Sequence, residues 1–282
     1  MLTRVITGAV ALIIFVPVLF FSHLIIFDIV IGLLSLFGTL ELLKCVGLAK
    51  KYLICAPSCA VAFLVPVMIR YARQEAVVLV VVAYLFYLLY ASVFARKHIS
   101  TSDIALSFFA AVYVTIAFTS ILVTRNLEHG NVIYIMIFVG AWSSDTFAYF
   151  TGRLLGGRVF GGRKLMPDIS PNKTIEGAIG GVAFCSLSFV LFGLIISVMY
   201  RFDAEPYYLI LAAAGVFTSV VAQLGDLSAS AIKRNYGLDD FGAVFPGHGG
   251  ILDRFDSVMA VAPVIMIIGA LFTIFEEYGL FV

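Results

Sequence analysis

The residues best equipped for chemistry lie between Gln223 and Asp256, a stretch that carries five aspartates, two arginines and one lysine. The chain as a whole is 62% hydrophobic and only 12% charged. Charged side chains are costly in so apolar a chain, so we expect those in this stretch to serve a function. Separated carboxylates, strong cations and a glycine-rich loop are the parts of a Mg²⁺-assisted phosphoryl or nucleotidyl transfer site.

The spacing of these residues predicts two helices that flank a loop. One polar stripe of the first helix, at positions i, i+3, i+7 and i+10, holds Gln223, Asp226, Ser230 and Lys233. The proline and glycines of 246–250 forbid a regular helix and allow backbone N–H groups to converge on an anion. With a helix from Leu252 onward, Asp253 and Asp256 share one face of it.

A second polar region precedes this one. Asp145 sits about six residues from the end of an apolar segment at 132–150. We expect its carboxylate to point into the helix bundle, toward a cation, a lysine or a water-filled cleft. A purely structural ion pair is the alternative.

Basic residues alternate with paired glycines between 151 and 174. Ser170 and Pro171 fit the N-cap and the first residue of a helix, which predicts that the next apolar segment begins near Pro171. The first turn of that helix would hold Asn172, Lys173 and Thr174. A helix N-terminus binds anions through its backbone N–H groups. The alternative is a positively charged loop that only fixes membrane topology.

These polar regions are set among apolar segments long enough to span a bilayer. The chain has 282 residues and a mean hydropathy of +1.09, which is beyond the range of soluble domains. Nine apolar segments lie at about 5–21, 24–40, 53–69, 76–94, 104–123, 132–150, 175–199, 207–224 and 257–275. The sequence therefore predicts an all-α polytopic integral membrane protein with about nine transmembrane helices. Asp28 and Glu41, near the ends of the second segment, are expected at the membrane interface.

No linker in the sequence is long enough to separate soluble domains. We expect two domains, both built from transmembrane helices. Residues 1–130 would form an N-terminal domain of about five spans, and residues 131–282 a catalytic domain of about four spans with loops 151–174 and 225–256. In the nine-span arrangement, fourteen Lys and Arg residues lie on the N-terminal side of the membrane and four on the other. The positive-inside rule then places the N-terminus and both loops in the cytoplasm and the C-terminus outside.

Composition also narrows the choice of partners. The net charge of +1 gives no reason to expect a nucleic acid as partner. The four cysteines show neither a metal-binding spacing nor a disulfide framework.

The segment Ser230–Asp256, SAIKRNYGLDDFGAVFPGHGGILDRFD, closely resembles the signature of the phosphatidate cytidylyltransferases, also called CDP-diacylglycerol synthases. The spacing matches without a gap. One position departs: Asp239 stands where the family usually has Lys. We therefore expect Asp239 at the solvent-exposed rim of the loop and Asp240, which matches, facing inward.

A second region, from Asp145 to Gly181, resembles the same family through its D-T-x-A-Y, S-P-x-K-T and E-G elements. Asn172 and Ile175 stand where the family commonly has Lys and Trp, while Lys173 is retained. The first 130 residues match only in being hydrophobic, with an Arg near the start.

The resemblance implies transfer of the cytidylyl group of CTP to phosphatidic acid, in a bacterial-type plasma (inner) membrane. Its catalytic residues would be Asp226, Lys233, Arg234, Asp240, His248, Asp253, Arg254 and Asp256. Its substrate-binding residues would be Asp145, Ser170, Asn172, Lys173, Thr174, Ser230, Gly249 and Gly250. Mg²⁺ would bind at Asp226, Asp253 and Asp256, with a second cation as an option. His248 would assist the leaving pyrophosphate or only form a hydrogen bond within the loop.

Other functions stay open at this point. A CTP-dependent kinase of a lipid alcohol would need a base to activate a hydroxyl group. A cytidylyltransferase for an archaeal-type ether lipid is a second option, and a membrane transporter is an option of another class. The expected partners are CTP, phosphatidic acid and the lipid bilayer, and a homodimer is compatible with the sequence.

Overall fold

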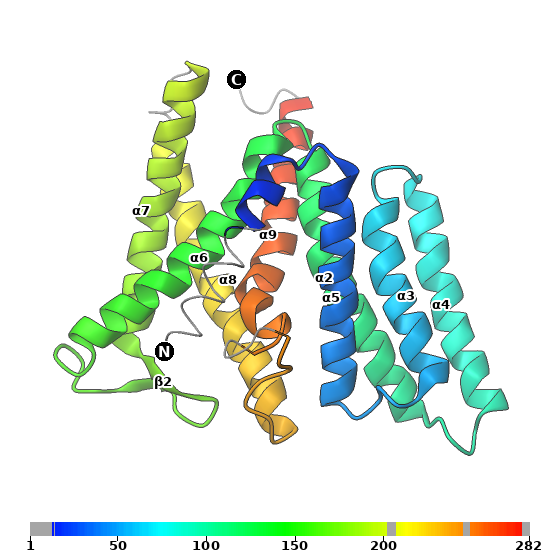
Figure 1. The fold of residues 1–282 in the computed structure, drawn as a ribbon. Coiled ribbons are helices and arrows are strands. Elements are labelled where there is room, and N and C mark those ends of the chain that lie inside the picture. Colours follow the sequence, from blue (N-terminus) through cyan, green and yellow to red (C-terminus); the bar gives the residue numbers. More distant parts are fainter. Residues whose placement is uncertain (1–12, 14, 202–206, 245–248, 278–282) are drawn as a thin grey trace. The chain divides into compact units, whose positions relative to one another are not determined.

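The computed structural model describes residues 13, 15–201, 207–244 and 249–277. The long helices of this part are α2 (Ile25–Cys45), α3 (Tyr52–Met68), α4 (Gln74–Phe94), α5 (Thr101–Asn126), α6 (Gly130–Leu155), α7 (Ile175–Tyr200), α8 (Tyr208–Asn235) and α9 (Leu252–Glu277) (Figure 1). Two short strands, β1 (Lys164–Met166) and β2 (Ser170–Thr174), form a hairpin between α6 and α7.

Seven of these helices are long and apolar enough to cross a membrane, and α3 is a shorter apolar helix of 17 residues. Helices are the expected form because a single helix satisfies its own backbone hydrogen bonds in lipid. The prediction of an all-α polytopic membrane protein is confirmed. The count of nine spans stays a prediction, because most of the first predicted span, 5–21, lies outside the described residues.

The chain divides into two compact units, a first unit of Met1–Asn131 and Asn235–Phe255 and a second unit of Val132–Arg234 and Asp256–Val282. Residues 235–255, expected within the catalytic domain, thus group with the N-terminal helices. The functional division into an N-terminal and a catalytic domain stays a prediction.

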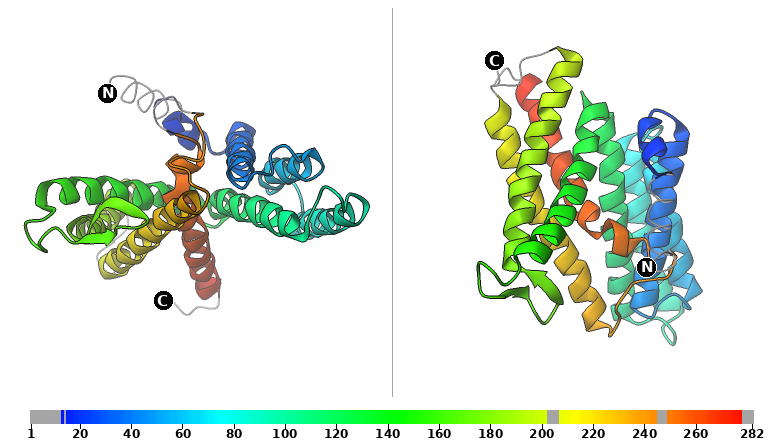
Figure 2. Two further views of the ribbon diagram at one scale, coloured as in Figure 1. Left: turned by 90° about the horizontal axis from the view of Figure 1, so that it is seen from below. Right: turned by 60° about the vertical axis from the view of Figure 1, so that its left-hand side comes forward.

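Four antiparallel helices form most of the described first unit. α3 packs against α2, α4 and α5, and α2 also packs against α5 (Figures 1 and 2). Ion pairs close both ends of this bundle. Lys51 meets Asp103 at 2.6 Å at one end, and Arg70 meets Asp28 at 2.6 Å at the other. Asp28 is only 3% exposed, and Arg70 supplies a partner for its buried charge; its expected depth at the membrane interface stays a prediction.

The start of α7 corrects one prediction from the sequence. The helix begins at Ile175, not near Pro171, so Asn172 and Lys173 lie on strand β2 and not in a helical turn. A residue before proline is driven out of the helical conformation, which favours an extended Ser170. Thr174 takes the N-cap role instead, because its Oγ1 accepts the backbone N–H of Gly177 at 3.1 Å.

Candidate active site

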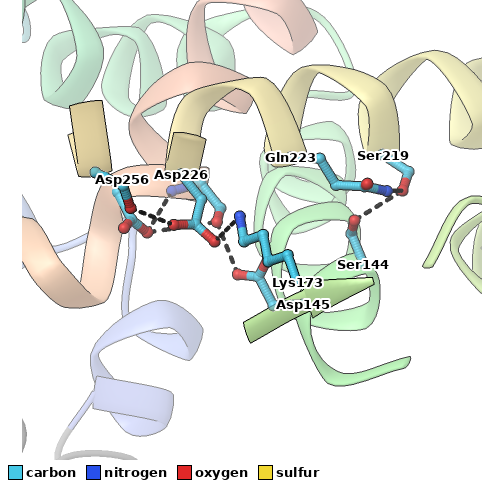
Figure 3. Close-up of polar contacts among 9 residues, drawn as sticks. Ser144, Asp145, Lys173, Ser219, Gln223, Asp226 and Asp256 are labelled. Carbon is cyan, nitrogen blue, oxygen red and sulfur yellow. Dashed lines mark hydrogen bonds and ion pairs between the residues drawn. The ribbon is translucent and has the colours of Figure 1, made fainter. Parts of the chain in front are cut away.

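Three helices of the second unit each contribute a carboxylate to one polar cluster (Figure 3). Asp145 lies on α6, Asp226 on α8 and Asp256 on α9. The three carboxylates are close enough for the charges of Asp145 and Asp226 to act on Asp256. The side chain of Asp145 is exposed, and it faces this cluster.

Ser257 joins two of these carboxylates. Its hydroxyl donates to Oδ2 of Asp145 at 2.7 Å, and its backbone N–H donates to Oδ1 of Asp256 at 2.8 Å. Ser257 is 3% exposed, so this link is fixed by packing. The sequence analysis missed Ser257, because a serine inside an apolar helix carries no signal of its own beyond its place directly after Asp256.

An ion pair to Lys173 and a hydrogen bond from Ser230 hold Asp226 in place. The Lys173 ammonium group contacts Oδ2 of Asp226, and the Ser230 hydroxyl donates to Oδ1 at 3.3 Å. Strand β2 carries Lys173, so the hairpin delivers a cation to the carboxylate of α8. Both side chains of the ion pair stay about a quarter exposed, at 26% and 27%. A ligand in solution can therefore reach them.

A neutral network lies on α8 before Asp226 and fixes the position of this helix (Figure 3). The Gln223 side-chain amide donates to the Ala178 carbonyl at 3.1 Å and to the Ser219 hydroxyl at 3.2 Å. The Ser144 and Ser219 hydroxyls share a hydrogen bond of 2.7 Å. Three helices, α6, α7 and α8, are thus tied together next to Asp226. This arrangement keeps the charged cluster in a defined geometry.

The glycine-rich loop before α9 belongs to the first unit, where two acidic side chains hold it. Oδ2 of Asp253 accepts the N–H groups of Phe241 and Gly250 at 2.8 and 2.9 Å. Gly249 adopts φ +83°, a left-handed conformation that favours glycine. The N–H of Gly250, which we expected to bind substrate, donates to Asp253 in this structure. The role of Gly249 and Gly250 in anion binding stays a prediction.

Glu41 of α2 is the second acidic side chain at this loop. Its two carboxylate oxygens accept the N–H groups of Ile251 and Leu252, each at 2.9 Å. Glu41 is 2% exposed, so its side chain is buried inside the protein, while its expected depth at the membrane interface stays a prediction. The physical reason is that the first residues of α9 have free N–H groups, and a buried carboxylate satisfies them.

The adjacent residues Asp239 and Asp240 agree only in part with the positions expected for them. Asp239 is exposed, as predicted for a rim position, but Asp240 is exposed as well. The expected inward orientation of Asp240 is therefore wrong. Phe241 is the residue that turns inward, with 6% exposure, because it packs its ring while its N–H binds Asp253. His248, also predicted to act in catalysis, lies outside the described residues.

The remaining predicted residues occupy varied positions. Lys233 is 8% exposed and close enough for its charge to act on Asp256. Arg234 and Arg254 have exposed side chains, at the end of α8 and the start of α9. Ser170 is half-buried and Asn172 exposed on β2. The second unit therefore gathers six predicted residues, which are Asp145, Lys173, Asp226, Ser230, Lys233 and Asp256.

The acidic cluster of the second unit fits a divalent cation by its chemistry. Three carboxylates lie in this cluster with the ammonium groups of Lys173 and Lys233. Within the described ranges, no three His, Cys, Asp or Glu side chains are arranged to hold a metal on their own. Mg²⁺ does not require three protein ligands, because it is usually held by one or two carboxylates together with water and substrate phosphates. Asp226 and Asp256 supply oxygen donors of this kind.

Known proteins resemble this chain over nearly its whole length. The model of the Cytidylyltransferase family matches residues 2–272. A protein of Staphylococcus aureus (strain COL) named phosphatidate cytidylyltransferase is 35% identical over 271 residues, which cover 95% of this chain and 98% of the relative.

Two further relatives carry the same name. The one from Staphylococcus haemolyticus is 36% identical over 274 residues, with 95% and 98% covered. The one from Bacillus subtilis is 40% identical over 184 residues, or 64% of each chain. The extent of the family match and these identities show that the chain belongs to the cytidylyltransferase family.

Proposed function

We propose that this membrane protein transfers the cytidylyl group of CTP to phosphatidic acid and forms CDP-diacylglycerol and pyrophosphate. The observation that carries the proposal is the cluster of Asp145, Asp226 and Asp256 with Lys173, set in a bundle of membrane-spanning helices. Its chemistry suits a polyanionic nucleotide and a lipid held in the same membrane. Membership of the cytidylyltransferase family and the name that its relatives share support this substrate pair.

The reaction makes one phosphorus–oxygen bond and breaks another. An oxygen of the phosphatidic acid phosphate attacks the α-phosphorus of CTP, and the bond from that phosphorus to the β-phosphate bridge breaks. Pyrophosphate leaves with the electron pair. The attacking phosphate monoester is already ionised near neutral pH, so the protein needs no strong general base. Its task is to position both substrates and to neutralise their charges.

Each residue of the cluster has a task in this scheme. The Lys173 ammonium group can exchange the Asp226 carboxylate for a phosphate oxygen, because both groups are partly exposed. The network of Gln223 and Ser219 keeps Asp226 in place while this exchange occurs. Lys233, Arg234 and Arg254 remain the predicted cations for the other phosphate oxygens.

A magnesium ion is the cofactor that this donor set fits. Asp226 and Asp256 would hold it, with Asp253, three residues before Asp256 on α9, as the further ligand predicted from the sequence. When bound, Mg²⁺ would supply positive charge that offsets the charge of the triphosphate. A second cation stays a prediction.

The orientation in the membrane is also part of the proposal. The excess of Lys and Arg on one side supports an active site that faces the cytoplasm of a bacterial-type plasma membrane, where CTP is available. Phosphatidic acid would enter sideways between helices, with its acyl chains in the bilayer. A homodimer stays compatible with this arrangement.

Labelled CTP distinguishes this reaction from the alternatives. Purified protein is incubated with phosphatidic acid, Mg²⁺ and CTP that carries label at either the α- or the γ-phosphate. Label in the lipid from the α position alone is the expected result. Label from the γ position alone, with a lipid alcohol as acceptor, identifies a kinase. No transfer of either label contradicts the proposal and favours transport. Asp226→Asn serves as the matched control for contaminating activity.

A further inference from the structure

Glu41 is the one acidic residue of α2 whose partners come from the far end of the chain. Its carboxylate accepts the N–H groups of Ile251 and Leu252, each at 2.9 Å, across 210 and 211 residues of sequence. It is 2% exposed. A carboxylate buried this deeply is costly unless donors surround it, so both of its oxygens are used.

Two glycines that precede α9, Gly242 and Gly250, lie directly against this carboxylate. A Cβ atom at Gly242 would lie 2.6 Å from Oε1 of Glu41, and one at Gly250 would lie 2.4 Å from it. Any other residue at these positions would push the carboxylate or the loop away. Gly242 and Gly250 are thus both fitted closely to the Glu41 side chain.

Consecutive backbone N–H groups at the end of this loop all meet acidic oxygens. Gly250 donates to Asp253, and the next two residues, Ile251 and Leu252, donate to Glu41. Asp253 also accepts the N–H of Phe241. The two acidic side chains therefore determine together where the loop ends and where α9 begins.

We infer that Glu41 is a positioning residue for the reaction. It acts through Ile251 and Leu252, which set the first turn of α9 and with it the direction of the Asp253 carboxylate. This inference rests on the proposed function, in which Asp253 is a predicted ligand of Mg²⁺. Glu41 touches neither substrate nor metal in this role. A full carboxylate is required, because a glutamine offers one acceptor and turns its amide donors toward the other N–H group.

The substitution Glu41→Gln tests the inference with two independent measurements. Hydrogen–deuterium exchange of the substrate-free protein should show amides of 249–254 exchanging about tenfold to a hundredfold faster, since a hydrogen bond to a charged acceptor is lost. In the labelled-CTP assay, the Mg²⁺ concentration for half-maximal rate should rise about tenfold, because the metal ligand is less well oriented. The KM for phosphatidic acid should stay within about twofold.

Asp28→Asn provides a matched control in the same helix. Asp28 is 3% exposed and pairs with Arg70 at the opposite end of the bundle. Its substitution should speed exchange around Arg70 but leave the loop amides and the Mg²⁺ requirement unchanged. An equal rise in the Mg²⁺ requirement for both variants would mean that Glu41 only stabilises the fold, and the inference would be overturned.

A second variant, Gly242→Ala, keeps the carboxylate and displaces it. It should speed exchange of the same loop amides, and it replaces Glu41→Gln as the test if that variant does not fold. Unchanged loop exchange in Gly242→Ala, or in folded Glu41→Gln, overturns the inference. A wild-type protein that transfers no label instead contradicts the proposed function, while the exchange data still decide whether Glu41 holds the loop.

Discussion

Removing the Ser257 hydroxyl should impair catalysis without touching any charged residue. This hydroxyl donates to Oδ2 of Asp145 at 2.7 Å and comes from a residue that is 3% exposed. A hydrogen bond to a charged group contributes about 1.5–3 kcal/mol. The Asp145 side chain is exposed, so water replaces part of this energy, and the lower end of the range applies. A loss of about 1.5 kcal/mol corresponds to about a tenfold fall in kcat/KM for Ser257→Ala.

The assay is the steady-state transfer of α-labelled cytidylyl groups to phosphatidic acid at varied CTP. Ser186→Ala is the matched control, because it removes a hydroxyl that donates to the Ala212 carbonyl at 2.9 Å, elsewhere in the second unit. It should leave kcat/KM within about twofold. The reasoning is refuted if folded Ser257→Ala keeps a kcat/KM within twofold of the wild type. It is equally refuted if Ser186→Ala is impaired to the same degree, since the loss would then reflect general loosening.

Three further outcomes are expected. Asp226→Asn should reduce turnover at least a hundredfold at low Mg²⁺, because it removes the carboxylate that pairs with a cation; near-normal turnover would place the metal elsewhere. Asp239→Lys should change the KM for CTP less than about fivefold, since a screened charge on an exposed side chain contributes at most about 1 kcal/mol; a severe rise in KM would show that this side chain meets the nucleotide. A reporter fused after Val282 should lie outside the cytoplasm and one inserted within 156–164 inside it, and both on one side would contradict the nine-span topology.

The helices of this protein could be predicted well from hydrophobicity alone. The apolar segments from 24–40 to 257–275 fall on α2 to α9, because a bilayer demands long, uninterrupted apolar helices. The hairpin β1–β2 was not predictable in the same way. Ser170 and Pro171 match a helix cap equally well, and only pairing with Lys164–Met166 selects the extended form.

Contacts within one helix of the site were predictable, and contacts between helices were not. The spacing of Asp226 and Ser230 by four residues places them on one stripe, and the structure shows the hydrogen bond. The pairing of Lys173 with Asp226 depends on where a hairpin meets a helix, which no periodicity reveals. The partners of Glu41 were missed for the same reason. Its position in an apolar helix was a signal of function, but its partners lie more than two hundred residues away.

The contact between Glu41 and the start of α9 has a consequence for biosynthesis. Ribosomes add about 5–20 residues per second, so the 210 residues between Glu41 and Ile251 take roughly 10–40 s to make. Throughout that interval α2 is in place without the amide groups that satisfy its carboxylate. The N-terminal helices therefore reach their final state only when nearly the whole polypeptide has been translated. A nascent chain that stops before Ile251 therefore holds the Glu41 carboxylate without the two N–H groups that bind it in the finished protein.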